Sequence, residues 1–214
     1  MPKRLLLWDI DGTLITTGAA GQRAIIRATA KWFGNDGDLG GVEIAGRTDV
    51  GIAHQILEKH REPITEGKVT AFLDLYLKFL EEELPRSKGS VLPGVRQLLE
   101  KFAPQPDTAL GLLTGNLKRG AQLKLAHYQL WQFLDFGAFA LERAEQETGI
   151  KFSPEQVDVI GDTGHDIACG KAFGARTIAV ATGSWSREKL AAEKPDFLFN
   201  DLGDVDDAIA TLGW

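Results

Sequence analysis

The sequence predicts an α/β fold in which a doubly wound parallel sheet, a Rossmann-like core, is interrupted by an inserted helical unit. An apolar run at residues 5–8 is typical of a buried strand. From residue 91 onward, helical periodicity alternates with short apolar runs, which is the pattern of a parallel sheet. Between these two regions, residues 16–88 contain no strand-like run.

The inserted unit is expected to consist of three amphipathic helices. Apolar residues recur in it at three- and four-residue spacing. The predicted helices are 22–33, 48–60 and 65–84. We therefore expect an α/β core formed by residues 1–15 and 89–214, and a helical domain formed by residues 16–88.

The second half of the core is expected to supply four further strands and the helices that connect them. The predicted strands are 108–113, 157–161, 176–181 and 196–199. The predicted helices begin near Pro93 and then cover 118–130, 140–148, 165–173, 186–193 and 204–212, with a further apolar run at 133–139. Cys169 falls at helical spacing, and we expect it to pack in the core.

Composition excludes several classes of protein. The chain has 214 residues, of which 43% are hydrophobic, and 24 basic against 30 acidic residues give a net charge of −6. It has no basic tract, so nucleic acid is not an expected partner. The single cysteine excludes an intramolecular disulfide and fits a reducing cytoplasm. Without an apolar segment of ~20 residues, no membrane span is expected, and we predict a cytoplasmic protein of unspecified oligomeric state.

Two carboxylates mark the end of the first predicted strand. Asp9 and Asp11 are two residues apart, so in an extended chain their side chains project to the same side. They repel each other unless a cation lies between them or one carries a proton. Asp and Gly also occur in ordinary turns, so this segment alone does not decide between a site and a turn.

Two later strand ends favour a site. The run at 157–160 leads into Gly161 and Asp162, with Asp166 close behind, and the run at 110–113 leads into Thr114–Asn116. The carboxyl ends of parallel strands meet at one edge of the sheet, where ligands bind in open α/β folds. The sequence therefore predicts an oxygen-rich, metal-binding pocket at this edge.

These segments, in this order, resemble those of the haloacid dehalogenase-like hydrolases, most of which are magnesium-dependent phosphatases. The resemblance covers nearly the whole chain and is specific for the superfamily rather than for a substrate. It implies that residues 16–88 form a mobile cap. It also implies hydrolysis of a small phosphorylated metabolite, broadly as in phosphoglycolate phosphatase.

The resemblance assigns roles to the acidic residues. Asp9 is the expected nucleophile, forming an aspartyl-phosphate. Asp11 is the expected general acid and then general base. Mg²⁺ is expected on the side chains of Asp9 and Asp162 and the backbone carbonyl of Asp11, with Asp166 a further ligand, directly or through water. Dehalogenases lack an aspartate at the second position, so Asp11 favours phosphate ester hydrolysis.

The phosphoryl group has its own expected partners. Thr114 is expected to donate a hydrogen bond to a phosphoryl oxygen, together with the backbone N–H groups of Gly115 and Asn116 at a helix start. In the turn at 46–49, Thr48 is a candidate helix N-cap. Arg47 in the same turn either binds a substrate carboxylate or phosphate, or is a solvated side chain beside the capping turn.

One expected residue is missing. The family supplies a lysine or arginine between the Thr-Gly and Gly-Asp segments, but here residues 135–139 run almost directly into a helical pattern. Either the cation is absent, another residue replaces it, or a loop near 139–140 is missing. The basic residues considered as replacements are Arg143, Lys151, Lys118 and Arg119. Two alternatives to a phosphatase stay open: a phosphomutase of the same family, which would need an acid/base pair from the cap, and, if the cation is absent, a catalytically weak phosphoryl-binding protein.

Overall fold

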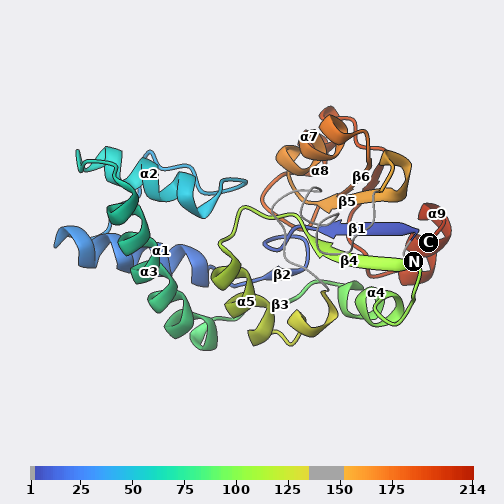
Figure 1. Cartoon of the computed structure of the whole chain (residues 1–214), viewed down its shortest axis with the longest axis horizontal. Helices are drawn as coiled ribbons and strands as arrows, with labels where there is room; N and C mark the ends of the chain where they lie inside the picture. The colour runs from blue at the N-terminus through green and yellow to red at the C-terminus, as the bar shows by residue number, and fades with distance from the viewer. Residues whose placement is uncertain (1–2, 135–151) are drawn as a thin grey trace. The chain divides into compact units, whose positions relative to one another are not determined.

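The computed structural model describes residues 3–134 and 152–214, and Figure 1 shows their arrangement. They form two compact units. The first comprises the described residues of Met1–Thr16, Ser90–Thr114 and Tyr128–Trp214, and the second comprises Thr17–Gly89 and Gly115–His127. The predicted helix at 140–148, most of the run at 133–139, Arg143, Lys151 and the loop near 139–140 lie outside the described residues.

The first unit contains a five-stranded sheet whose neighbouring strands all pair in parallel, in the order β4-β1-β5-β6-β7. The strands are β1 (Arg4–Trp8), β4 (Thr108–Leu112), β5 (Val157–Gly161), β6 (Arg176–Val180) and β7 (Phe197–Phe199). Both β4 and β5 are buried along their whole length, as continuous apolar strands covered on both faces should be. The predicted doubly wound α/β fold is confirmed.

The helices of this unit agree with the predicted segments. Among the described residues, the α-helices are α4 (Val95–Phe102), α7 (Gly164–Phe173), α8 (Arg187–Ala192) and α9 (Val205–Leu212). Helix α7 packs on β5 and β6, which places its first turn beside the end of β5. The expectation for Cys169 is wrong: it is exposed, because α7 buries Ile167 and Gly170 against the sheet instead.

A short antiparallel ribbon was not predicted. Strand β2 (Ile15–Thr16) pairs with β3 (Ser90–Val91), where the chain leaves the first unit and returns to it. Each strand has only two residues, which is too short for a periodicity to show in the sequence.

The second unit is helical. It contains α1 (Ala20–Phe33), α2 (Asp49–Lys59), α3 (Glu66–Glu83) and α5 (Lys118–His127). Helix α3 packs against the other three and contributes Phe72 and Leu80 to their common core. The prediction placed residues 115–127 in the α/β core, but α5 and the loop before it belong to the helical unit. The other predicted domain boundaries stay predictions.

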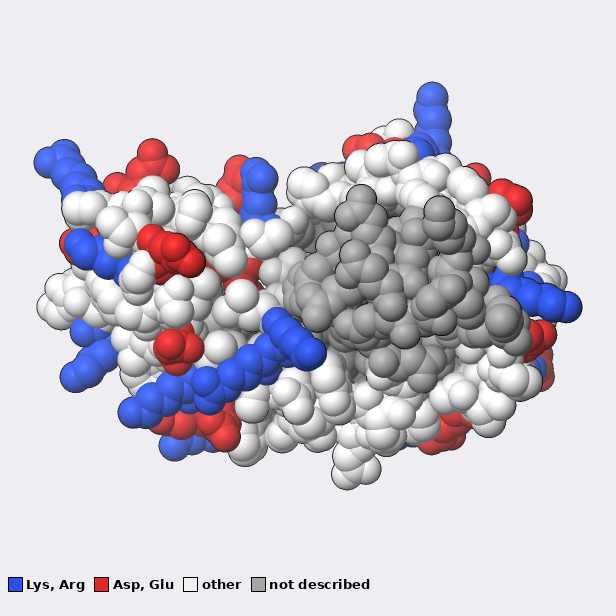
Figure 2. All heavy atoms as spheres, in the orientation of Figure 1, with Lys and Arg blue, Asp and Glu red and all other residues white. Residues whose placement is uncertain are grey.

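Helix α2 begins as predicted. Thr48 is its N-cap, and the Thr48 side chain accepts a hydrogen bond from the backbone N–H of Gly51 over 3.0 Å. Within the described part of the chain, no helix has both the length and the apolar character needed to cross a bilayer. On the described surface in Figure 2, basic and acidic side chains are interspersed.

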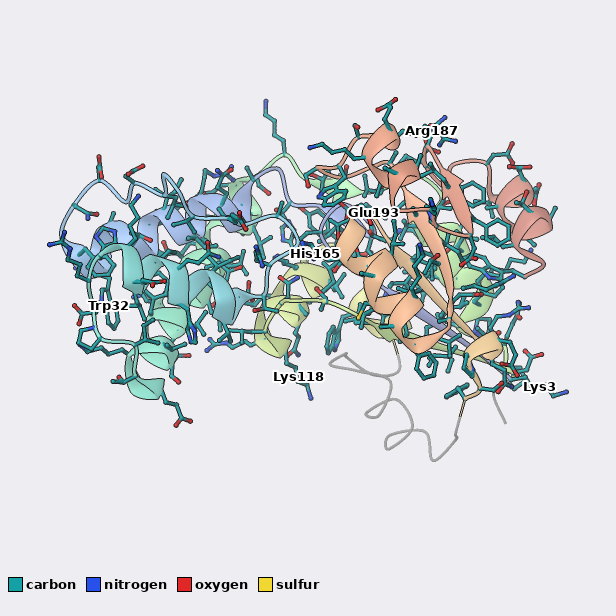
Figure 3. The ribbon with its side chains drawn as sticks, turned by 90° about the horizontal axis from the view of Figure 1, so that it is seen from above. Lys3, Trp32, Lys118, His165, Arg187 and Glu193 are labelled. Carbon is teal, nitrogen blue, oxygen red and sulfur yellow. The ribbon has the colours of Figure 1, made fainter. Side chains whose placement is uncertain are left out.

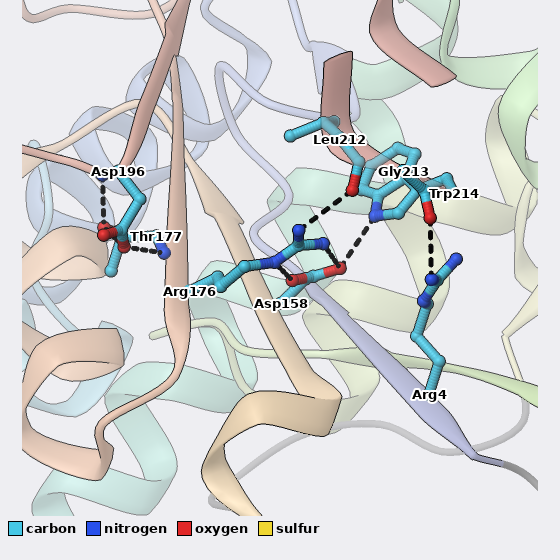
Figure 4. A network of polar contacts seen from close by, with 8 residues as sticks. All are labelled: Arg4, Asp158, Arg176, Thr177, Asp196, Leu212, Gly213 and Trp214. Carbon is cyan, nitrogen blue, oxygen red and sulfur yellow. Dashed lines mark hydrogen bonds and ion pairs between the residues drawn. The ribbon is translucent and has the colours of Figure 1, made fainter. Parts of the chain in front are cut away.

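A polar network holds the end of the sheet where the parallel strands begin (Figure 4). Asp158 of β5, which is 2% exposed, accepts two hydrogen bonds from Arg176 of β6, of 2.6 and 2.8 Å. The indole N–H of Trp214 donates to the same carboxylate over 2.7 Å. These contacts join the segment after α9 to the sheet, at the opposite end of β5 from Asp162.

Candidate active site

Three carboxylates meet where β1 and β5 end. Oxygen atoms of Asp9, Asp162 and Asp166 all lie within 4.8 Å of one another. The pairing of the two strands brings Asp9 and Asp162 to the same edge, because Trp8 is in register with Ile160, two residues before Asp162, and the Asp9 N–H donates to the Ile160 carbonyl over 2.9 Å. The structure thus brings together three of the four predicted acidic residues.

Asp166 comes from the first turn of α7, next to His165, which is labelled in Figure 3. Its Oδ2 accepts hydrogen bonds from the backbone N–H and the hydroxyl of Thr163, at 3.0 and 2.6 Å. This capping box holds the carboxylate at the helix start. Helix capping therefore fixes the position of the Asp166 carboxylate in the cluster.

Asp162 is held by two donors. Its Oδ1 accepts a hydrogen bond from the Thr13 hydroxyl over 3.3 Å, and its Oδ2 accepts one from the backbone N–H of Ser184 over 3.3 Å. Asp162 is only 2% exposed, and Thr13 is buried as well. Neither hydrogen bond was predicted, although both donors follow predicted strands and therefore lie at the same edge of the sheet as Asp162.

Glycines leave room for the carboxylates. A side-chain carbon on Gly183 would lie 1.6 Å from Asp162 Oδ2, and one on Gly161 would lie 2.2 Å from the carboxyl carbon of Asp166. Gly12 is constrained twice, because its φ is +92° and a side-chain carbon there would lie 2.6 Å from Asp162 Oδ2. The backbone thus approaches the acids more closely than any other residue type allows.

The cluster carries more negative charge than its surroundings can stabilise. Burial raises the pKa of Asp9 well above its ordinary value, and repulsion from Asp166, Asp11 and Asp162 raises it further. Burial followed by the charge of Asp166 raises the pKa of Asp162 to about 7, and burial raises the pKa of Asp166 as well. Such a cluster must bind either protons or a cation, and its hard oxygen donors suit Mg²⁺.

Asp11 lies apart from the three clustered carboxylates. Its side chain is exposed, whereas its charge is close enough to contribute to the raised pKa of Asp9. The adjoining backbone forms a tight turn in which the Gly12 N–H donates to the Ile15 carbonyl over 2.8 Å. The expected role of the Asp11 carbonyl as a metal ligand stays a prediction.

The predicted phosphate-binding residues follow β4. The Leu113 N–H donates to the Trp8 carbonyl over 2.8 Å, so the chain is anchored to β1 one residue before Thr114, which is half-buried. Gly115 and Asn116 belong to the helical unit, and Asn116 is buried.

The loop after Thr114 is held by Asp49, whose role was not predicted. Asp49 donates its backbone N–H to the Gly115 carbonyl over 2.8 Å, and its Oδ2 accepts the Leu117 N–H over 2.7 Å. Arg47, two residues earlier, is exposed and ion-paired with Glu43. Its predicted contact with substrate stays a prediction.

The predicted replacements for the missing cation do not lie in the protein interior where the structure describes them. Lys118 and Arg119 are exposed at the start of α5, and Figure 3 labels Lys118. Lys124 of the same helix, which nothing in its sequence context singles out, is buried and donates to Asn116 Oδ1 over 2.6 Å.

Comparisons with known proteins find similarity to haloacid dehalogenase-like hydrolases. The family model described as HAD-hydrolase-like matches residues 137–205. The probable phosphatase IndB of Dickeya dadantii is 28% identical, over 95% of this chain and 92% of that protein. The pyrophosphatase PpaX of Bacillus cereus is 26% identical, over 94% of this chain and 93% of that protein. The resemblance to the haloacid dehalogenase-like hydrolases is confirmed. The names of these relatives agree with the prediction of a phosphoric monoester hydrolase.

Solved structures of haloacid dehalogenase-like proteins share the fold. CbbY from Rhodobacter sphaeroides, in complex with phosphate, aligns with a TM-score of 0.75 at 16% identity, over 96% of each chain. A predicted phosphoglycolate phosphatase from Haemophilus somnus aligns with a TM-score of 0.71 at 18% identity, over 97% of this chain and 99% of that one.

Proposed function

We propose that this chain is a Mg²⁺-dependent phosphatase that hydrolyses a small phosphorylated metabolite through an aspartyl-phosphate intermediate on Asp9. The observation that carries the proposal is the group of three carboxylates within 4.8 Å at the carboxyl edge of the sheet. Its raised pKa values indicate a site built for a cation. The phosphatase names of the relatives support the reaction class.

The metal would be held by the side chains of Asp9, Asp162 and Asp166 and, from the family resemblance, by the backbone carbonyl of Asp11. A bound Mg²⁺ would offset the negative charge shared by these carboxylates and a phosphoryl group, which otherwise repel each other. Thr13 and Ser184 keep Asp162 in place, and Thr163 does the same for Asp166.

The reaction has two steps. A carboxylate oxygen of Asp9 forms a bond to phosphorus as the bond to the ester oxygen breaks, and Asp11 donates a proton to that departing oxygen. Asp11 then takes a proton from water, whose oxygen attacks phosphorus and releases inorganic phosphate and free Asp9. Asp11 is exposed, which makes it accessible to a leaving group and to water.

Transferring a phosphoryl group depends mainly on positioning and on positive potential around its oxygens. We assign the binding of these oxygens to the Thr114 hydroxyl and the backbone N–H groups of Gly115 and Asn116. Arg47, freed from Glu43, would bind an anionic group on the remainder of the substrate.

Hydrolysis of para-nitrophenyl phosphate tests the proposal. We expect turnover that requires Mg²⁺, stops on chelation and is abolished in Asp9→Asn. Asp206→Asn, which changes an exposed aspartate of α9, is the matched control and should keep full activity. Acid-quenched wild-type enzyme should carry phosphate on Asp9, as detected by mass spectrometry. Full activity of Asp9→Asn would refute the nucleophile, and transfer to a sugar phosphate instead of water would identify a phosphomutase.

A further inference from the structure

A lysine is buried inside the helical unit. Lys124 of α5 is 4% exposed, and its Nζ donates to Asn116 Oδ1 over 2.6 Å. A side-chain carbon on Gly21 of α1 would lie 3.9 Å from Lys124 Nζ and 3.9 Å from the Tyr76 hydroxyl of α3. The ammonium group therefore lies among α1, α3 and α5. Lysine is rarely buried in this way, because removing its charge from water is costly.

The chemistry of this pair fixes the orientation of the Asn116 amide. An ammonium group only donates hydrogen bonds, so Lys124 must face the amide oxygen. The NH₂ group of Asn116 is then directed away from Lys124 as a donor. Phosphoryl oxygens only accept hydrogen bonds, so this orientation is the one that suits a phosphate.

The backbone around Asn116 is already fixed. Asp49 bonds to Gly115 on one side and to Leu117 on the other. A side-chain carbon on Gly115 would lie 2.8 Å from the Arg47 carbonyl oxygen, so this loop packs closely against the turn before α2. The bond from Lys124 to Oδ1 restricts rotation of the Asn116 amide.

We infer that Lys124 is a positioning residue, which orients the Asn116 amide for a phosphoryl group. It takes the place of the basic residue expected between the Thr-Gly and Gly-Asp segments. The inference rests on the proposed function, since it specifies how that site binds phosphate. A charge-assisted hydrogen bond is stronger than a neutral one, which suits an oriented group in the interior.

Kinetics of Lys124→Met, Asn116→Ala and the double variant test this inference. We expect each single substitution to raise both the KM for para-nitrophenyl phosphate and the inhibition constant of inorganic phosphate by about tenfold or more. If Lys124 acts through Asn116, the double variant should differ from Asn116→Ala by less than about twofold. Lys124→Arg should restore part of the affinity. Lys78→Met, which changes an exposed lysine of α3, is the control and should behave as wild type.

The outcomes separate the inference from the proposed function. The role of Lys124 would be overturned if folded Lys124→Met kept the wild-type inhibition constant of inorganic phosphate. It would also be overturned if the two single substitutions multiplied their effects on KM in the double variant. Neither result would affect the proposal that the wild type is a phosphatase. If the wild type hydrolyses no ester, the proposed function fails. Calorimetric binding of inorganic phosphate to the Mg²⁺-loaded variants then still decides whether Lys124 orients Asn116. Should Lys124→Met not fold, Lys124→Arg and Asn116→Ala supply the same comparison.

Discussion

The acidic cluster predicts that the metal-free protein loses stability as pH rises. The pKa of Asp162 is about 7 in the folded chain, against an ordinary value of 3.8. The folded state therefore binds a proton more tightly than the unfolded state does, and this contribution to stability disappears as pH rises toward 7. Asp162 is 2% exposed, so solvent screening does not diminish the effect.

The magnitude follows from the shift. One pKa unit corresponds to about 1.4 kcal/mol, so between about pH 5.5 and pH 8 the single Asp162 should lower the free energy of unfolding by about 2 kcal/mol. Asp9 and Asp166, whose pKa values are also raised, act in the same direction. Carboxylates with lowered pKa, such as that of Asp196, stay ionised across this range and do not contribute.

Urea unfolding in a chelator at several pH values measures the effect. Wild-type protein should be more stable at about pH 5.5 than at pH 8, whereas Asp162→Asn should lose most of this slope, because an amide does not titrate. Mg²⁺ should stabilise the wild type more at the higher pH, where it meets ionised carboxylates. The same pH slope in Asp162→Asn and wild type would show that the cluster does not carry the proposed charge.

Two further substitutions test the site and its support. Gly183→Ala should weaken Mg²⁺ binding and activity at least about tenfold, because its side-chain carbon would overlap Asp162 Oδ2. A metal titration measures this effect. Gly67→Ala is the control and should bind Mg²⁺ as the wild type does, because nothing lies within 4 Å of a side-chain carbon at that position. Trp214→Phe removes one hydrogen bond to the buried Asp158 carboxylate and should lower the free energy of unfolding by about 1–3 kcal/mol, with KM unchanged. Wild-type Mg²⁺ affinity in Gly183→Ala, or wild-type stability in Trp214→Phe, would contradict the corresponding geometry.

Much of the fold could be predicted because burial on both faces gives the strands a distinctive composition. The run before Asp9 and the run before Asp162 are short and mostly apolar, as central parallel strands require, and Asp158 is the one charged residue of β5. Once both are strands of one sheet, their carboxyl ends must share an edge, and the two acids must approach each other. The cluster therefore follows from local patterns combined with one rule of topology.

Features that depend on tertiary packing were not predictable in this way. The pattern of α5 shows that it is a helix but not which unit it packs against; the prediction placed it in the α/β core, whereas its contacts group it with the helical unit. The prediction that Cys169 is buried was wrong for a similar reason. Helix α7 buries Ile167 and Gly170, and the spacing in the sequence does not determine which face of the helix packs on the sheet. Gly183 and Ser184 approach Asp162 through a loop that carries no motif.

The burial of Lys124 also depends on tertiary packing, and it bears on the proposed phosphate-binding site. In sequence it is an ordinary lysine on an amphipathic helix, where the default expectation is a solvated ammonium group. It becomes buried only because α1, α3 and α5 enclose it, and that enclosure depends on the unit to which α5 belongs. A search for the missing cation near the expected position in sequence therefore overlooks a residue that reaches the phosphate-binding loop through space. If its bond to Asn116 has the predicted effect on phosphate affinity, the short segment between the Thr-Gly and Gly-Asp motifs does not by itself imply a weak enzyme.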